Sequence, residues 1–144
     1  MENVKQYIVL RKDAKTKTGN PVSASKLAVM TSHASMSFLT KMIMDNEKDN
    51  SVAFVLNSDL KEWISGIYTK ILLEAKNLNA MNKTIERAKE AGLIEGKDFF
   101  LIKDNCLTEL VPDEGSDRCF IAIGFRPMDT EKIKPVVKKL QLYK

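Results

Sequence analysis

Short apolar runs alternate along this chain with segments whose apolar residues recur at helical spacing. Strand-like runs occupy 6–11, 70–74, 98–102 and 118–125, and helical patterns occupy 24–43, 51–65, 77–91 and 129–139. Strands that alternate with helices predict an α/β fold in which helices cover a sheet. With 144 residues, 44% of them apolar, the chain is long enough for a real core, so we expect one domain over residues 1–144.

The composition argues against a membrane, disulfide or metal protein. No apolar run approaches the length of a membrane span, and strand-like residues begin near position 5, which leaves no room for a signal peptide. Cys106 and Cys119 are too few for a disulfide scaffold, and with the single histidine they make a poor zinc set. We therefore expect a cytoplasmic protein with no metal, no other cofactor and no membrane partner.

The net charge of +4 is concentrated at the start of the chain. The first 43 residues hold seven Lys or Arg and two acidic residues, whereas the remainder holds sixteen basic and seventeen acidic residues. Lys12, Lys15 and Lys17 lie in a segment with Gly and Asn that we expect to be a flexible loop. Such lysines can contact nucleic-acid phosphates, although a solvated lysine-rich loop explains them equally simply. The acidic stretch 109–117 argues against a broad nucleic-acid surface.

The helix predicted at 24–43, capped by Ser23 or Ser25, has two apolar stripes, so we expect it to be covered from more than one direction. Lys26 falls in its first turn, where a cation opposes the helix dipole. Lys26 either forms an anion site with the helix N-terminus or points outward to solvent. His33 lies two turns further along the same face and is either a proton-transfer group or a structural histidine in an apolar setting.

Asp104 closes the apolar run 99–102, and Thr108 follows in a loop. Ligands of open α/β sheets bind beyond the carboxyl ends of strands, so we expect Lys26, Asp104 and Thr108 to converge at one end of the sheet. Asp104 could orient or activate a water, or could simply bond its own backbone in a turn. Thr108 likewise could position a substrate or form a turn. Sequence motifs for a nucleophilic serine, a phosphate loop or a dinucleotide are absent, and the cysteines fit core or loop thiols better than nucleophiles.

Five segments in order give the chain a resemblance to a known family. They are Tyr7–Asp13, Lys26–Ala34, Leu60–Trp63 with Lys70–Ala75, Ile102–Leu110, and Phe120–Gly124 with the closing Val-Lys-Lys-Leu-Gln-Leu-Tyr. Over its whole length the chain resembles the type-2 peptidyl-tRNA hydrolases. The resemblance implies a three-layer α/β/α sandwich around a mixed four-stranded sheet, often as a homodimer. It also implies metal-independent hydrolysis of the ester between peptide and tRNA.

By motif match, the family's functional positions fall on Lys26, His33, Asp104 and Thr108. The resemblance implies that Lys26 holds a tRNA phosphate or the ester oxyanion, that Asp104 and Thr108 orient the attacking water, and that His33 acts or supports the others. Lys12, Lys15 and Lys17 would contact the tRNA.

Three departures from the family pattern keep a second interpretation open. Met30 replaces the family's helix glutamine, Asn105-Cys106 replaces its Ala-Gly, and Cys119 stands where a threonine is expected. Retention of Lys26, Asp104 and Thr108 favours a peptidyl-tRNA hydrolase. Met30 and Cys119 favour a non-catalytic module that binds tRNA ends or a protein partner. An unrelated α/β domain would require the ordered matches to be chance.

Overall fold

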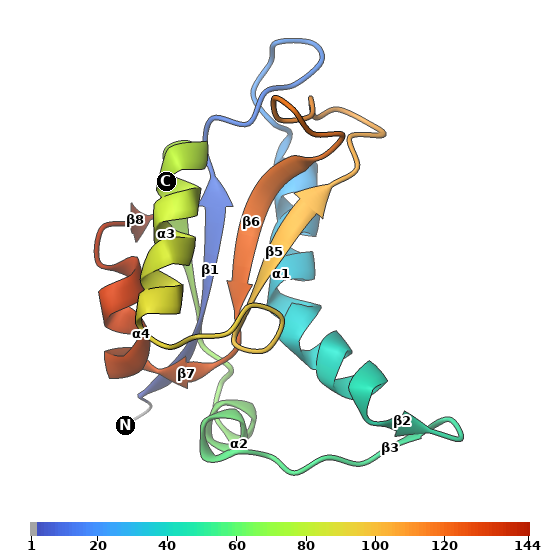
Figure 1. The fold of residues 1–144 in the computed structure, drawn as a ribbon, viewed down its shortest axis with the longest axis vertical. Helices are drawn as coiled ribbons and strands as arrows, with labels where there is room; N and C mark the ends of the chain where they lie inside the picture. The colour runs from blue at the N-terminus through green and yellow to red at the C-terminus, as the bar shows by residue number, and fades with distance from the viewer. Residues whose placement is uncertain (1–2) are drawn as a thin grey trace.

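A mixed sheet with helices on both faces forms the centre of the protein, seen in a computed structural model that describes residues 3–144 (Figure 1). Its strands are β1 (Val4–Arg11), β4 (Lys70–Ala75), β5 (Phe99–Asp104), β6 (Cys119–Phe125), β7 (Met128–Asp129) and β8 (Gln141–Leu142). The helices are α1 (Ala24–Asp45), α2 (Ser58–Ser65), α3 (Leu78–Glu90) and α4 (Thr130–Val137). The predicted three-layer α/β/α architecture is confirmed. Within the described residues, no helix is long and apolar enough to span a membrane.

The sheet order is β5-β6-β1-β4-β8, and β7 also pairs with β1. The four long strands are the predicted ones, and the two-residue strands β7 and β8 enlarge the sheet beyond the predicted four. β1 and β4 are parallel, whereas β6 runs antiparallel to both β1 and β5. Strands β1, β4 and β5 therefore all end at the same edge of the sheet, which we call the carboxyl edge.

Alternation of side chains along β1 supplies the core on both faces of the sheet. Val9 is buried in a cluster with residues of α3 and α4, whereas Ile8 and Leu10 are buried in a cluster with residues of α1. Burial of each such side chain contributes about 1.5–3 kcal/mol. In Figure 1, α3 and α4 lie on one side of the sheet and α1 on the other.

Two contacts fix the position of α1 on the sheet. The Gln6 side chain is fully buried; its amide donates to the carbonyls of Ser35 (2.8 Å) and Phe125 (3.1 Å), and it accepts from the Ser35 hydroxyl. Gly124 of β6 lies so close to α1 that an added Cβ would be 2.1 Å from the carbonyl oxygen of Ala34. The helix that carries Lys26 and His33 is thereby held at a defined depth.

The first of the two apolar stripes of α1 is buried, and the second is covered only in part. Met30, Ala34 and Phe38 are buried, but Val29 and Met36 are about half exposed, at 48% and 49%. One helix face rests on the sheet, and of the second stripe Leu39 packs against the cluster that contains Leu60 and Trp63 of α2. Ser23, not Ser25, is the N-cap, and its side chain accepts from the Lys26 amide.

The helix predicted at 51–65 was wrong in its first half. β2 (Glu47–Lys48) and β3 (Ser51–Val52) form a separate two-stranded hairpin, with both turn residues in the left-handed region at φ 53° and 62°. α2 begins only after Asn57, whose side chain caps it by accepting from Leu60 N. Polar turn residues that tolerate positive φ favour a hairpin here over the helical spacing of the apolar residues.

Candidate active site

Lys26 and Asp104 meet at the carboxyl edge because α1 begins where β5 ends. Lys26 Nζ lies 2.8 Å from Asp104 Oδ1, and both side chains are largely shielded from solvent, at 16% and 10% exposed. Lys26 Nζ also donates to Thr108 Oγ1 at 3.3 Å. The expected convergence of these three residues is confirmed, although about eighty residues separate the first two in the chain.

Asp104 also shapes the loop that follows it. Its Oδ2 accepts a hydrogen bond from the backbone N–H of Cys106 at 2.9 Å, so the turn-forming interpretation of Asp104 holds alongside the ion pair. Cys106 adopts φ 60°, a left-handed conformation that favours glycine. The turn therefore has the backbone conformation of an Asp-x-Gly turn with a cysteine at its third position. This turn aims Thr108 back toward Lys26.

Glu109 links the site loop to the start of α1. Its Oε1 accepts from the Ser23 hydroxyl at 2.6 Å and its Oε2 accepts from the Ser23 amide at 2.9 Å. These two hydrogen bonds lower the pKa of Glu109 below its usual value. This role could not be predicted from the sequence, because no local pattern connects a glutamate to a serine 86 residues away. Glu109 and Ser23 together hold the helix turn that carries Lys26 against the loop that carries Thr108.

The basic segment before α1 is tied down, which contradicts the expectation of a flexible loop. Thr16 forms an isolated antiparallel β-bridge with Leu110, and the Lys17 amide donates to the carbonyl of Glu109 at 2.8 Å. Lys17 Nζ reaches the carbonyl of Cys106 at 2.9 Å, which brings it to the site loop. Figure 1 shows the two loops together above the sheet.

The other two lysines of this segment do not reach the site. The Lys12 side chain contacts the C-terminal residues instead of the site loop. Its Nζ donates to the carbonyl of Lys144 at 2.8 Å and lies 4.3 Å from the Tyr143 ring centroid. Lys15 is exposed.

Arg11 supports the same edge from below. It bonds Asp13 and Asp113, each at 2.6 Å, and donates to the carbonyl of Phe120. Burial opposes the charge of Arg11, but the bonds to the two carboxylates outweigh it and raise its pKa above the ordinary value. Part of the acidic stretch that argued against nucleic acid is thus committed to internal contacts, because Glu109 and Asp113 both bond within the protein.

A pocket of about 350 Å³ opens beside the ion pair. Its lining consists of Lys26, Met30, His33, Ile102, Lys103, Asp104, Asn105, Leu107 and Thr108. All four predicted catalytic positions therefore border one cavity, whereas the predicted contacts Lys12, Lys15 and Lys17 lie outside it.

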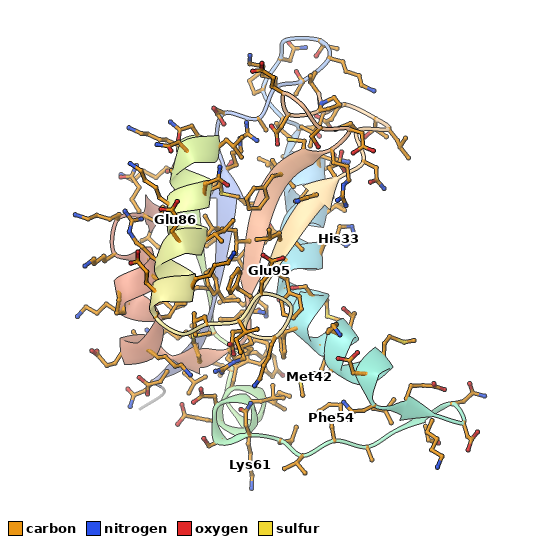
Figure 2. All side chains as sticks on the ribbon, viewed as in Figure 1. His33, Met42, Phe54, Lys61, Glu86 and Glu95 are labelled. Carbon is orange, nitrogen blue, oxygen red and sulfur yellow. The ribbon has the colours of Figure 1, made fainter. Side chains whose placement is uncertain are left out.

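His33 is exposed on the pocket wall, not in the apolar setting that the sequence suggested (Figure 2). Met30 is buried at 5% exposed and makes part of the pocket lining apolar. Lys103 and Asn105 border the pocket too, which was not predicted from the sequence.

The two cysteines fit no nucleophilic role. Both are unpaired and buried. Burial raises the pKa of each thiol, with the charge of Asp104 adding to the effect at Cys106, and the pKa of Cys119 reaches about 11. Such thiols stay protonated and inert at neutral pH. Among residues 3–144, no group of three or more His, Cys, Asp or Glu side chains is placed to hold a metal ion.

Comparisons with known proteins agree with this architecture. The family model described as Peptidyl-tRNA hydrolase PTH2 matches residues 4–143. A solved structure of a protein of unknown function from Agrobacterium tumefaciens strain C58 is similar over 100% of both chains, with 11% sequence identity and a TM-score of 0.55. At that identity, the second likeness shows a shared fold alone.

Proposed function

The chain belongs to the peptidyl-tRNA hydrolase PTH2 family, and we propose that it hydrolyses the ester bond that joins a peptide to the 3′ end of tRNA. The observation that carries the proposal is the contact of one ammonium group with both an acidic and a hydroxyl side chain beside a pocket. Lys26 Nζ donates to Asp104 and to Thr108, so one of its three protons remains for a ligand.

This arrangement suits an attack by water on an ester. Asp104 and Thr108 offer an acceptor and a hydroxyl within one small volume, which is what is needed to orient a water molecule. The free proton of Lys26 and the amides of the first turn of α1 offer positive charge to an oxyanion. The position of Lys26 in the first turn of α1, where it opposes the helix dipole, is explained if the site stabilises negative charge.

In the proposed reaction, the water oxygen bonds to the ester carbonyl carbon while Asp104 accepts one water proton. The carbonyl oxygen takes up the negative charge next to Lys26. Collapse of this intermediate re-forms the carbonyl and breaks the bond to the ribose oxygen, which receives the proton from Asp104. The products are a peptide acid and a tRNA with a free 3′-terminal ribose. His33, exposed on the pocket wall, would contact the substrate and not the water.

The tRNA itself would meet cations around the pocket. Lys17 at the site loop and Lys103 at the pocket rim are the nearest candidates for the terminal phosphates. Lys15 is exposed on the same segment as Lys17, and Lys12 follows β1 toward the opposite face of the sheet. We propose that these contacts add affinity that is independent of sequence and that weakens as salt rises.

The direct test is release of peptide from purified peptidyl-tRNA by the purified protein, with EDTA present to remove free metal. We expect multiple turnovers, and we expect Lys26→Ala to lose both tRNA affinity and rate because one cation serves phosphate and oxyanion alike. Lys41→Ala is the matched control, since Lys41 pairs with Asp45 at the same 2.8 Å but in an exposed position.

A non-catalytic module that binds tRNA ends is the second candidate, and the buried Met30 is the observation that favours it. Where the family has an amide, the pocket wall is apolar and offers no hydrogen bond to the substrate. Folded protein that binds tRNA but releases no peptide would establish this candidate and refute the enzyme.

A further inference from the structure

A basic groove lies between α3 and α4, on the face of the sheet opposite α1. Two hollows of about 480 and 250 Å³ adjoin each other there and share Arg87 in their lining. Six cationic side chains border them: Lys76, Lys83, Arg87, Lys132, Lys138 and Lys139. One acidic residue, Glu90, is in the lining.

The spacing of the cations along the helices explains why they form one row. Lys76, Lys83 and Arg87 are separated by seven and four residues, which places them on one face of α3 and its entry. At 1.5 Å per residue, Lys83 and Arg87 are about 6 Å apart along the axis. Lys132 and Lys139 are likewise separated by seven residues on and just after α4. The two rows face each other across the groove.

Within the described residues none of these six cations forms a close ion pair or a side-chain hydrogen bond, although the charge of Lys132 acts on Asp98 from a distance. Some cations at other places in the chain are paired, for example Arg126 with Asp98 and Asp59. Six like charges gathered around a single acidic residue, Glu90, oppose the folded state, so the arrangement has a structural cost. A bound polyanion would offset this cost.

The groove connects to the candidate active site along the carboxyl edge. Lys76 follows β4 directly, and Lys12 follows β1, its parallel neighbour; the Lys12 amide donates to the carbonyl of Ala75 at 2.9 Å. Lys17 continues the series to the site loop. A chain of cations thus leads from the pocket, over this edge, to the groove on the other face.

We infer that the groove between α3 and α4 binds the sugar–phosphate backbone of an RNA arm. This inference rests on the proposed function, because it takes the arm to belong to the tRNA whose 3′ end occupies the pocket. A row of unpaired Lys and Arg fits a backbone of regularly spaced phosphates. A membrane surface fits less well, because none of the large exposed apolar side chains lines the groove and peripheral helices need such anchors.

The test compares two triple variants with the same change in charge. The groove variant is Lys83→Gln, Arg87→Gln and Lys138→Gln. The control is Lys48→Gln, Lys61→Gln and Lys97→Gln, all exposed lysines without an ion pair and outside the groove. The affinity of each for deacylated tRNA is measured from low to high salt, after circular dichroism has shown that both are folded.

We expect the groove variant to bind tRNA about 10- to 100-fold more weakly near 0.1 M salt, with a log–log salt slope smaller by about 2–3. With peptidyl-tRNA as substrate, the loss should appear mainly in KM. The control should stay within about twofold of the wild type. Equal losses in both variants would mean that net charge alone acts, and unchanged binding in the groove variant would overturn the inference.

Two further measurements separate this inference from its alternatives. If the groove variant loses binding to phosphatidylserine vesicles but keeps its tRNA affinity, the groove serves a membrane and the inference is overturned. Release of peptide from saturating peptidyl-tRNA by the wild type tests the proposed function alone. No release there, with groove-dependent tRNA binding intact, would refute the enzyme while supporting the groove.

Discussion

Asp104→Asn removes the charge of the candidate base while keeping its shape, and the structure shows what else it removes. One oxygen of Asp104 accepts from Lys26 and the other from the Cys106 amide, at 2.8 and 2.9 Å. Asparagine has a single side-chain oxygen, so its NH₂ group would face one of the two donors, Lys26 Nζ or the Cys106 N–H. Because asparagine forms such turns readily, we expect it to keep the bond to Cys106 and to lose the bond to Lys26.

The expected loss in the free energy of unfolding is about 1–2 kcal/mol, since a hydrogen bond to a charged group is lost. The loss is no larger because the Lys26 ammonium keeps its hydrogen bond to Thr108 and still faces the open pocket. The expected loss in kcat is much larger, roughly 10²-fold or more, because the base is gone. A stability cost is thus part of the prediction.

Peptide release and urea unfolding measure these two quantities. Asp45→Asn is the matched control: it breaks the Lys41–Asp45 pair of the same 2.8 Å length, which is 51% and 55% exposed. We expect that control to cost no more than about 0.5 kcal/mol and to leave kcat unchanged. If Asp104→Asn lost the expected stability but kept kcat within about threefold, Asp104 would be a turn residue only and the reasoning would be refuted.

Four further predictions concern positions around the site. Cys106→Gly should be tolerated, whereas Cys106→Val should unfold about 1–2 kcal/mol more easily in urea, since a β-branched side chain resists the positive φ of this residue. Gly124→Ala should cost about 3 kcal/mol and lower activity, because the new methyl collides with the Ala34 carbonyl and displaces α1. The pKa of Cys119 is raised from 9.0 to about 11, so the unfolded chain loses this proton first; the wild type should therefore lose more stability than Cys119→Ala as the pH rises from 9 to 11. Met30→Gln should raise kcat/KM if the lost amide attenuates the site, and unchanged kinetics would show that this position does not limit the reaction.

The strands and the contact between Lys26 and Asp104 could be predicted from the sequence for a physical reason. Buried strands appear as short apolar runs, and strands of one direction bring their ends to one edge, so a charge placed after a strand can be located in space without coordinates. Helix α1 could be predicted, but not the exposure of Val29 and Met36 in its second apolar stripe. Helical spacing shows which residues share a face and does not show whether a neighbour covers that face.

The contacts that the sequence did not reveal are those made across long separations by common residue types. The bonds of Glu109 to Ser23 and of Lys17 to the Cys106 carbonyl join segments 86 and 89 residues apart, and neither carries a local pattern. The hairpin at 47–52 was missed because valines and leucines beyond it mimic helical spacing. In each case the loop geometry, and not the composition, decided the contact.

The basic groove shows how a correct charge count can lead to an incomplete conclusion. Residues after position 43 are nearly balanced in charge, which placed the whole basic excess at the start of the chain. Balance along a sequence does not require balance in space. On α3, the inward positions Met81, Thr84 and Ala88 fix the orientation of the helix. Once they are known, Lys83 and Arg87 must lie on one outer face. The pattern was therefore present in the sequence, and the buried positions were needed to interpret it.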